Sequence, residues 1–280
     1  MQNLFFIGGD RRTVELINLL AKEEKTIYTY GLDKYEFKTN KVIKTKELEE
    51  FTKAEEIILP IPFSKDAKTI NAPFAEEEIS IEDLFSVLKN KKMTGGPFTK
   101  EIKEAASNNK IELNDILESE ELAILNAIPT AEGAIQIAME ESNEILSDSN
   151  VLILGFGRIG KILSKMLNGI GARVYCEARK KEDLARIESY GYEAIDLKEL
   201  CLHLNKFRYI FNTIPSLILD KEKLDLISRD CLIIDLSSKP GGVDFEYANI
   251  IGIKALLSLG LPGKLSPLTT AKYIKRVLNL

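Results

Sequence analysis

Short runs of apolar residues alternate along the whole chain with longer stretches in which apolar residues recur at the period of a helix. Such alternation is typical of α/β proteins whose strands form a parallel sheet. In the first half, a helix is predicted after the Gly8-Gly9-Asp10 turn, and residues 76–92 are expected to form a charged connection with a small helix. Strands are predicted at 4–7, 26–30, 57–59, the run before Thr94, and 111–113.

The second half opens, like the first, with a strand, a glycine turn and a helix. Ser266 and Pro267 begin a last helix, because proline is favoured at the first helical position. Leu268, Ala271 and Ile274 lie on one side of that helix. Strands are predicted at 151–154, 173–176, 209–212, 232–236 and 255–257, and helices at 158–168 and 181–190.

A long apolar helix is predicted between the two halves, over residues 119–147, with a break at Pro129. Proline has no amide hydrogen and its ring clashes with the preceding turn, so the pattern predicts a new helix start there. Thr130 then takes the N-cap position, and Glu132 falls in the first turn, where the helix dipole favours an acidic residue.

These elements predict an α/β protein with two parallel-sheet domains, Rossmann-like or flavodoxin-like, and a cleft between them. The expected N-terminal substrate domain spans 1–125, and an interdomain helix spans 126–147. A Rossmann domain that binds the nucleotide is expected over 148–257. The C-terminal segment, 258–280, is expected to return to the N-terminal domain as a helix.

Composition and charge exclude several classes of protein. The 280 residues carry 38 Lys and Arg against 43 Asp and Glu, a formal net charge of −5, whereas a dedicated nucleic-acid binder has a basic excess. No apolar run approaches the roughly 20 residues of a membrane span. The start, MQNLFFIGGDRR, lacks the basic leader and cleavage site of a signal peptide. We therefore expect a cytoplasmic protein that binds neither nucleic acid nor membrane.

Few residues are candidates for metal binding or nucleophilic catalysis. Cys176, Cys201 and Cys231 have no CxxC spacing, and the single histidine, His203, adds no metal-ligand spacing to them. We therefore expect no metal site, and a Ser-His-Asp or Cys-His catalytic group is disfavoured. The chemistry must come from a cofactor, or from carboxylates and lysines.

The strongest motif is VLILGFGRIG at residues 151–160, where Gly155, Gly157 and Gly160 form a G-x-G-x-x-G run. A strand precedes it, and a helix and a second strand follow, which is the context of a dinucleotide-binding fingerprint. In that context the first glycine permits the tight turn, the second admits the pyrophosphate, and the third allows close helix–strand packing. The first amides of the helix, at Arg158 and Ile159, are then available to phosphate.

The residues after the second strand indicate which nicotinamide cofactor binds. NAD-binding domains place Asp or Glu at the end of this strand, on the ribose 2′-hydroxyl. Here Ala178 takes the acidic position and Arg179 and Lys180 follow, which favours the 2′-phosphate of NADP. Glu177 is one residue early and should point to the other face. If the register slips by one residue, Glu177 becomes the ribose ligand and NAD is the cofactor.

Clusters of glycine and proline lie at the ends of predicted strands, at 95–96, 212–215, 237–242 and 260–264. Ligands of open α/β sheets bind beyond the carboxyl ends of the strands, so these clusters predict the rim of an active site, although ordinary turns are the alternative. The cofactor-binding candidates among them are Thr213, Pro215 and Ser237. The substrate-binding candidates are Gly95, Gly96, Gly260 and Pro262.

Several strings, in this order, resemble the A subunit of dipicolinate synthase from spore-forming bacteria. The most specific are NAIPTAEGAI at 126–135 and DLSSKPGGVDF at 235–245, since many dehydrogenases share the glycine fingerprint. The others are IGGDRR (7–12), ILPIP (58–62), LGFGRIGK (154–161), ARVYCEARKKEDLARI (172–187), NTIPS (212–216) and ALLSLGLPGKLSPLTTA (255–271). The resemblance covers nearly the whole chain.

The resemblance implies NADP-linked oxidation of a dihydrodipicolinate-level intermediate of the lysine pathway to dipicolinate. It also implies a partner, the flavoprotein-like B subunit, and expression in the mother cell during sporulation. It leaves open whether the chain forms a homo-oligomer.

A substrate with two carboxylates needs two anion-binding places. The predicted helix start at Thr130 and Ala131 offers one of them, and Arg12, which the GGD-x-R pattern of the family would retain, offers a bidentate grip for the other. For proton removal, the candidate residues are Asp10, Glu132 and Lys239.

Two other functions are considered. One is a different two-domain NAD(P)-dependent dehydrogenase, acting on a small carboxylate or a folate, because LPGKLSPLTTA also resembles the end of methylenetetrahydrofolate dehydrogenases. The other is a non-catalytic subunit that senses the dinucleotide, since a fold alone does not determine function.

Overall fold

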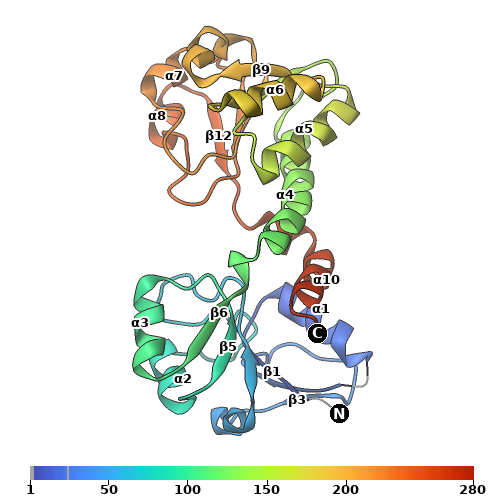
Figure 1. Ribbon diagram of the computed structural model, residues 1–280, viewed down its shortest axis with the longest axis vertical. Coiled ribbons are helices and arrows are strands. Elements are labelled where there is room, and N and C mark those ends of the chain that lie inside the picture. The colour runs from blue at the N-terminus through green and yellow to red at the C-terminus, as the bar shows by residue number, and fades with distance from the viewer. Residues whose placement is uncertain (1–2, 24) are drawn as a thin grey trace. The chain divides into compact units, whose positions relative to one another are not determined.

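The protein is described by a computed structural model that covers residues 3–23 and 25–280. The chain divides into two compact units (Figure 1). Unit 1 consists of the described residues up to Ala123 together with Ser266–Leu280, and unit 2 is Ile124–Leu265.

Unit 1 is built on a six-stranded parallel sheet with the strand order β3-β2-β1-β4-β5-β6. Its strands are β1 (Asn3–Ile7), β2 (Thr26–Tyr30), β3 (Val42–Lys44), β4 (Glu56–Ile58), β5 (Lys92–Gly95) and β6 (Glu112–Asp115). Its helices are α1 (Arg11–Ala21), η1 (Leu48–Lys53), α2 (Ile81–Val87), α3 (Lys100–Asn108), η2 (Ile116–Glu118) and α10 (Pro267–Val277).

Unit 2 repeats this architecture with the strand order β12-β11-β10-β7-β8-β9. Its strands are β7 (Asn150–Leu154), β8 (Arg173–Ala178), β9 (Glu193–Asp196), β10 (Tyr209–Asn212), β11 (Leu232–Asp235) and β12 (Lys254–Leu257). Its helices are α5 (Arg158–Ile170), α6 (Lys181–Ser189), η3 (Leu197–Leu202), η4 (Leu204–Lys206), α7 (Lys221–Asp225), α8 (Phe245–Ile250) and α9 (Leu261–Leu265). The predicted fold class, α/β with two parallel sheets, is confirmed.

Two strands, β3 and β9, are absent from the sequence-based prediction. Each forms one edge of its sheet. β9, with the sequence Glu-Ala-Ile-Asp, is charged at both ends, and β3 has only three residues. Edge strands bury less apolar surface than central ones and often carry charge, so neither segment has the apolar run that identifies the central strands.

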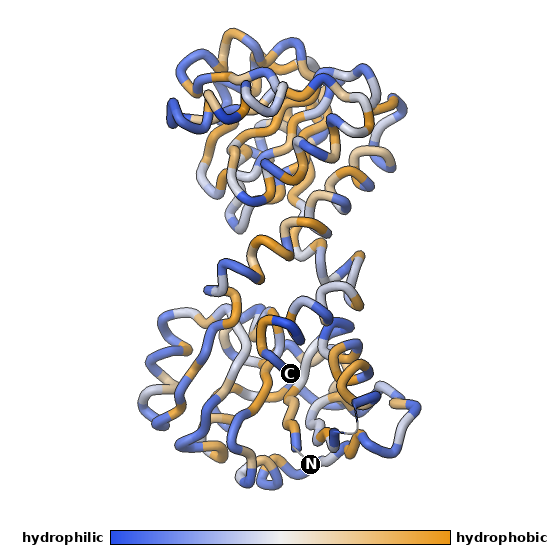
Figure 2. The backbone as a smooth tube through the Cα atoms, turned by 45° about the vertical axis from the view of Figure 1, so that its right-hand side comes forward, coloured by the Kyte–Doolittle hydropathy of each residue, from blue (hydrophilic) through white to orange (hydrophobic). Residues whose placement is uncertain are grey.

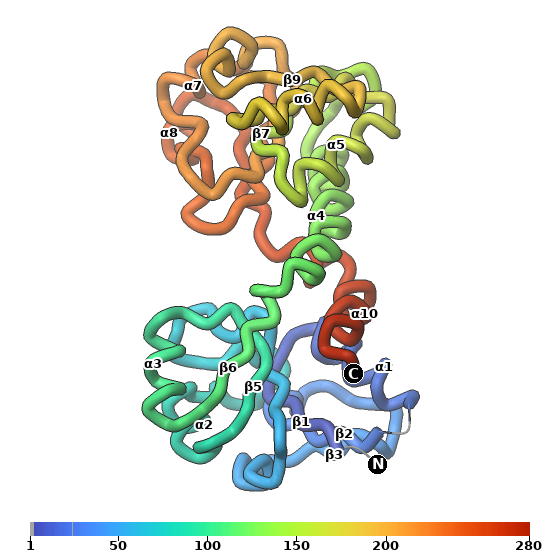
Figure 3. Tube along the Cα trace, in the orientation of Figure 1, coloured from blue at the N-terminus to red at the C-terminus, as the bar shows by residue number. Residues whose placement is uncertain are grey.

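The sheet of unit 1 has an apolar core on each face. One core gathers large aromatic side chains, among them Phe51, Phe63 and Phe85. The other core lies under α1 and includes Ala271 and Ile274 from α10. α10, at the end of the chain, therefore completes the core beside α1, as the red and blue segments of Figure 3 show.

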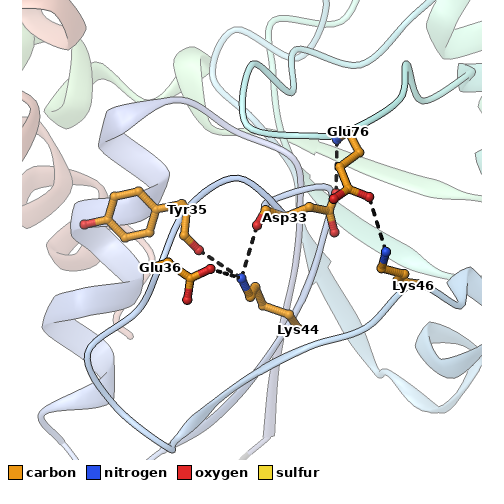
Figure 4. Close-up of polar contacts among 6 residues, drawn as sticks. All are labelled: Asp33, Tyr35, Glu36, Lys44, Lys46 and Glu76. Atoms are coloured by element: carbon orange, nitrogen blue, oxygen red, sulfur yellow. Dashed lines mark hydrogen bonds and ion pairs between the residues drawn. The ribbon is translucent and has the colours of Figure 1, made fainter.

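Polar contacts connect the loops on the surface of unit 1 (Figure 4). Lys44 Nζ donates to the backbone oxygens of Asp33 and Tyr35, at 3.1 and 3.2 Å, and contacts the Glu36 carboxylate at 3.0 Å. The backbone N–H of Glu76 donates to the Asp33 carboxylate. These contacts hold the segment after β2 against β3 and against the segment before α2.

The sheet of unit 2 is also covered on both faces, as parallel sheets generally are. α5 and part of the long helix α4 (Glu120–Glu141) pack on one face, where Ala134, Ala138 and Leu163 are fully buried. The 3-10 helices and the segments around α7 and α8 cover the other face. In Figure 2 the hydrophobic colour follows the inner segments of this unit, and the hydrophilic colour follows its outer loops.

The predicted break at Pro129 is wrong, because α4 is one continuous helix with Pro129 inside it. The Thr130 hydroxyl donates to the backbone oxygen of Asn126, at 2.7 Å, within the turn that contains the proline. Burial of Ala131, Ala134 and Ala138 in the core of unit 2 favours continuation. Packing of this apolar face offsets the roughly 3 kcal/mol that proline costs in a helix interior.

α4 is also long and apolar enough, by length and composition, to cross a membrane. Half of its most apolar window is buried within the protein, however. Its buried alanines and Ile135 contact the β-sheet core of unit 2, so α4 is a core helix.

Replacement of Ile274 tests whether α10 is an integral part of unit 1. Ile274 is 4% exposed in the core beside α1, so we expect Ile274→Ala to destabilise unit 1 by about 2–4 kcal/mol. Leu268→Ala is the matched control on the same helix, because Leu268 is 44% exposed. Chemical denaturation, followed by tyrosine fluorescence and circular dichroism, measures both variants. Equal, small effects of the two substitutions would contradict the assignment of α10 to this core.

Candidate dinucleotide and substrate sites

Each sheet has a topological switch point, where the strand order reverses, and ligands of open α/β sheets bind there. In unit 2 this point lies between β7 and β10. Gly155 follows β7, and the segment 212–215 includes the last residue of β10 and those after it. In unit 1 the corresponding point lies between β1 and β4, beside Gly8 and Gly9.

The three glycines of the fingerprint are needed for different geometric reasons. Gly155 has φ +90°, and a Cβ there would lie 2.6 Å from the Thr213 hydroxyl oxygen. A Cβ on Gly160 would lie 2.2 Å from the backbone oxygen of Gly155, so α5 approaches the turn too closely for any side chain. A Cβ on Gly157 would meet nothing within 4 Å. The space in front of Gly157 is therefore open to a ligand.

The N-terminus of α5 can bind an anion. Gly157 is its N-cap, no side chain caps it, and its first turn has no acidic residue. Unpaired amides and the helix dipole favour phosphate at such a terminus. Arg158 and Ile159, predicted to bind the cofactor, form the first turn of α5.

The corresponding helix of unit 1 differs in this respect. Asp10 is the N-cap of α1, and its carboxylate accepts from the Arg12 N–H at 2.9 Å. The N–H of Gly9, in the turn before α1, is also paired, because it donates to the Asn71 backbone oxygen. A carboxylate at the helix start repels phosphate, so the dinucleotide is expected at α5 and not at α1.

The end of β8 carries Glu177, which is almost fully buried, at 1% exposure. Its Oε2 accepts from the Gly155 N–H at 3.1 Å. Burial raises the pKa of the Glu177 carboxyl above its ordinary value, and the hydrogen bond from Gly155 partly opposes that shift. Arg179 and Lys180 are exposed immediately after the strand. Ala178 packs in the core on the α5 side, so no acidic side chain occupies that position.

Two buried polar side chains, missed by the sequence analysis, shape the loops after β10 and β11. Asp235 and Asn212 are fully buried, and Asn212 Nδ2 donates to Asp235 at 2.9 Å. Asp235 also accepts from the backbone N–H groups of Ser237, at 2.9 Å, and Gly242, at 2.7 Å. A Cβ on Gly242 would lie 2.3 Å from Asn212 Nδ2. The sequence does carry a signal that could have identified both residues: each is a polar residue at the end of an otherwise apolar strand.

The other predicted residues of this rim take different positions. The Thr213 hydroxyl donates to the backbone oxygen of Leu154 at 2.9 Å and so joins the two sides of the switch point. Ser237 is 4% exposed, and its hydroxyl has no hydrogen-bond partner in the part of the chain that the structure describes. Pro215 and Lys239 are exposed in their loops.

In unit 1, Arg12 is paired with Asp10. Its Nε and Nη2 donate to the Asp10 carboxylate, with the shortest contact at 2.6 Å. This side-on pairing leaves the end of the guanidinium group, at Nη1, without a hydrogen bond among the described residues. Arg12 and Gly95 line the same small pocket, together with Leu59 and Ile61.

The two glycines at the end of β5, Gly95 and Gly96, are required by the packing around them. A Cβ on Gly95 would lie 2.7 Å from the Leu59 Cβ. Gly96 has φ +127°, and a Cβ there would lie 2.1 Å from an Asp115 carboxylate oxygen. Asp115 in turn accepts from the Phe98 N–H and the Leu117 N–H. The two glycines therefore shape the strand end beside Arg12.

The predicted anion site at the start of a helix at Thr130 is not present. Both Thr130 and Ala131 lie inside α4, where the Thr130 hydroxyl is bonded to Asn126 and Ala131 is fully buried. Glu132 is exposed in mid-helix and not in a first turn. The amides that were expected to bind a carboxylate are those of a helix interior, because α4 does not break at Pro129.

The remaining substrate-binding candidates lie at α9, which packs against α4. A Cβ on Gly133 would lie 2.6 Å from Leu265 Cδ1, so this glycine lets the two helices approach. Gly260, with φ +68°, precedes α9, and Pro262 lies within it. Arg12, Gly95 and Gly96 belong to unit 1, whereas Thr130, Gly260 and Pro262 belong to unit 2.

Comparison with known proteins gives the family. Residues 3–117 match the model of the N-terminal domain of the dipicolinate synthase A subunit. Residues 127–237 match the NAD binding domain of D-isomer specific 2-hydroxyacid dehydrogenases. The chain is 33% identical over 276 residues to the dipicolinate synthase A subunit of Bacillus subtilis (strain 168), covering 98% of this chain and 93% of that protein.

Solved structures agree with this result. The dipicolinate synthase A subunit from Bacillus halodurans has a TM-score of 0.93 and 32% identity, covering 99% of this chain and 96% of that one. The A chain of dipicolinate synthase from Bacillus subtilis has a TM-score of 0.89 and 33% identity, covering 99% and 94%. D-lactate dehydrogenase from Escherichia coli, 13% identical with a TM-score of 0.65 over 99% and 95% of the two chains, shares the fold alone. The chain, with its dehydrogenase-type NAD-binding domain, belongs to the family of dipicolinate synthase A subunits.

Proposed function

We propose that this chain catalyses the NADP-dependent oxidation of a dihydrodipicolinate-level intermediate to dipicolinate. The observation that carries the proposal is the uncapped N-terminus of α5 behind the open Gly157. In a member of the dipicolinate synthase A-subunit family, this helix terminus can bind the phosphates of a dinucleotide cofactor. When bound, the nicotinamide ring accepts a hydride from the substrate ring.

The residues after β8 support NADP as the cofactor. Arg179 and Lys180 are exposed directly after the strand, and Ala178 offers no carboxylate to the ribose 2′-hydroxyl. A guanidinium group and an ammonium group attract the 2′-phosphate that distinguishes NADP from NAD. The amides of Gly157, Arg158 and Ile159 would hold the pyrophosphate. Thr213, Pro215 and Ser237 lie on the rim formed by the loops after β10 and β11.

For the substrate, we propose that one carboxylate binds the end of the Arg12 guanidinium group. Asp10 occupies the side of that group through Nε and Nη2, so it holds Arg12 in place and leaves the remaining N–H groups to a ligand. Asp10 is thereby a positioning residue, and we keep Glu132 and Lys239 as the candidates for proton removal.

We also propose that a B subunit, which the resemblance describes as flavoprotein-like, is the partner. The name of the Bacillus subtilis relative, which designates it as one lettered subunit, implies an enzyme with more than one kind of chain. We further propose that the protein acts in the cytoplasm of the mother cell, which is what the resemblance implies.

A direct assay tests this function. The purified chain is mixed with the lysine-pathway intermediate and NADP⁺, with and without its partner, and the absorbance of dipicolinate is followed. We expect dipicolinate to form together with an equal amount of NADPH, because one hydride leaves each substrate molecule. Dipicolinate formation that does not depend on any nicotinamide cofactor would overturn the proposal.

Replacement of Arg179 and Lys180 tests the cofactor preference. Each charge-assisted hydrogen bond contributes about 1.5–3 kcal/mol, so we expect the double alanine variant to weaken NADPH binding severalfold or more and to leave NADH binding nearly unchanged. Fluorescence titration of the two cofactors measures this. Arg186→Ala, an exposed arginine of α6 paired with Asp183, is the control. Equal losses for both cofactors would be evidence against a 2′-phosphate site here.

Replacement of Arg12 tests the substrate site. We expect Arg12→Ala to weaken dipicolinate binding strongly, and Arg12→Lys to restore little of it, because lysine cannot form the bidentate pair. NADPH affinity, measured without substrate, should stay within about twofold, since the cofactor binds elsewhere. Isothermal titration of dipicolinate measures the effect, with the exposed neighbour Arg11→Ala as control. Unchanged dipicolinate affinity in Arg12→Ala would exclude this residue as a ligand.

A further inference from the structure

Part of one face of the unit 1 sheet is open to solvent. On this face α1 and α10 cover the buried side chains of Leu4 and Phe6 in β1. Glu56 in β4 lies two residues before Ile58, which belongs to the same core, so the two side chains share this face. The register pairs Glu56 with Lys92 in β5, and these two side chains are 43% and 45% exposed. Parallel sheets are generally covered on both faces, so the open stretch needs an explanation.

A cavity of about 620 Å³ lies beside this stretch, and the described residues that line it belong to unit 1. Its apolar wall includes Leu4 and Ile58 from the sheet, and Leu278 and Leu280 from the segment after α10. Pockets for small molecules have volumes of roughly 300–1,000 Å³ and combine apolar walls with a few convergent polar groups. The cavity therefore has the size of a ligand site.

The most buried polar residue of the cavity is Thr94, at 1% exposure. Its hydroxyl donates to Glu56 Oε1 at 2.5 Å and accepts from Asn114 Nδ2 at 3.2 Å. A hydroxyl has one proton to donate, and an ionised carboxylate has none. Thr94 and Glu56 therefore present only acceptors to the cavity, and a ligand that complements them must donate.

The charged side chains of the cavity have both signs, with Lys53 and Lys92 against Glu55 and Glu56. The Lys92 ammonium lies 3.4 Å from Glu56 Oε1, and the Lys53 ammonium lies 3.7 Å from the carboxylate of Glu50. A purely anionic or purely cationic ligand would be repelled by half of the four lining groups. A ligand that carries one charge of each sign is attracted by both kinds.

We propose that this cavity binds a small zwitterion of the amino-acid type with an apolar side chain. Its ammonium group donates to Glu56 and Thr94. Its carboxylate accepts from Lys53 and Lys92, and its side chain packs against the apolar wall at Leu278. Hydrogen bonds between charged groups are roughly twice as strong as neutral ones, so both charges of the ligand contribute. The site is independent of the proposed reaction, because it uses neither the dinucleotide-binding residues nor the substrate ligand.

The cavity adjoins the small pocket of Arg12, since Ile58, Thr94 and Leu278 line both. The carboxylate of a zwitterion is also a ligand that a guanidinium group can bind. An experiment must therefore distinguish binding at Glu56 from binding at Arg12.

The probe is L-leucine, titrated calorimetrically into the full chain. Two analogues each lack one charge: 4-methylpentanoate has no ammonium group, and 3-methylbutylamine has no carboxylate. We expect leucine to bind about tenfold more tightly than either analogue, or better, because each analogue loses one of the two charge-assisted contacts.

Variants test the two ends of the ligand. Glu56→Gln keeps an oxygen that accepts from the Thr94 hydroxyl but carries no charge, and Lys92→Met keeps the length of the side chain. We expect each substitution to weaken leucine binding by about fivefold or more. Glu82→Gln, an exposed carboxylate in the first turn of α2, is the matched control and should leave leucine affinity unchanged.

A second measurement needs no variant. In the wild-type protein with isotope-labelled Ile and Leu methyl groups, leucine should shift the methyl resonances of Ile58 and Leu278, which line the cavity. The resonances of Ile233, buried in unit 2, should not move.

Four outcomes overturn the proposal. The first is no binding of leucine at concentrations up to about 20 mM, well above a millimolar dissociation constant. The second is equal binding of leucine and 4-methylpentanoate, which would indicate a site for anions only. The third is unchanged leucine affinity in both Glu56→Gln and Lys92→Met. The fourth is leucine binding that Arg12→Ala abolishes and Glu56→Gln does not affect, which would place leucine in the pocket of Arg12.

Discussion

The nucleotide-binding unit depends on the approach of α5 to the turn that follows β7. The space that a Cβ on Gly160 would occupy is taken by the backbone oxygen of Gly155, so the helix start lies directly against the strand end. This closeness brings the first amides of α5 to the switch point, and Gly157 leaves the space before them open. Any side chain at Gly160 would move the helix away and separate the positive end of its dipole from the place where phosphate binds.

A second fixed element lies under the loops on the other side of the switch point. Asp235 and Asn212 end adjacent strands and are fully buried, and between them they bond the backbone of both following loops. Buried polar groups are costly unless all their partners are in place. Here the partners are backbone groups of the rim, so the sheet core fixes the loops that carry Thr213 and Ser237. In unit 1, Asp10 plays a comparable part by fixing the guanidinium group of Arg12.

Much of this organisation follows from local patterns. The central strands are identified by their apolar runs, and the glycine fingerprint is identified by its spacing between a strand and a helix. β3 and β9 do not follow in this way, because edge strands bury little and carry no apolar run. The continuity of α4 depends on alanines that pack against a distant sheet and on the hydroxyl of Thr130, and a rule about proline alone cannot weigh these contributions.

The residues of the candidate site divide in the same way into those that local patterns predict and those that they do not. Gly155, Gly157 and Gly160 act through local backbone geometry, so their spacing predicts their positions. Asn212 and Asp235 are separated by 23 residues in the sequence and meet only because their strands are neighbours. The bond from Gly155 to Glu177 likewise needs the register of β7 against β8. The expected anion site at Thr130 failed for a single reason, the misplaced helix start.

The division of the chain between the units has a consequence for its synthesis. Unit 2 is an insertion within unit 1, since α10, from the last residues of the chain, packs beside α1 near the start. On the ribosome, unit 2 emerges as an uninterrupted segment and can fold as soon as it is released. The core beneath α1 cannot close until α10 has been synthesised, and its apolar surface stays uncovered until Ala271 and Ile274 arrive. The part of unit 1 that precedes unit 2 in the sequence is thus completed only after unit 2 has been made.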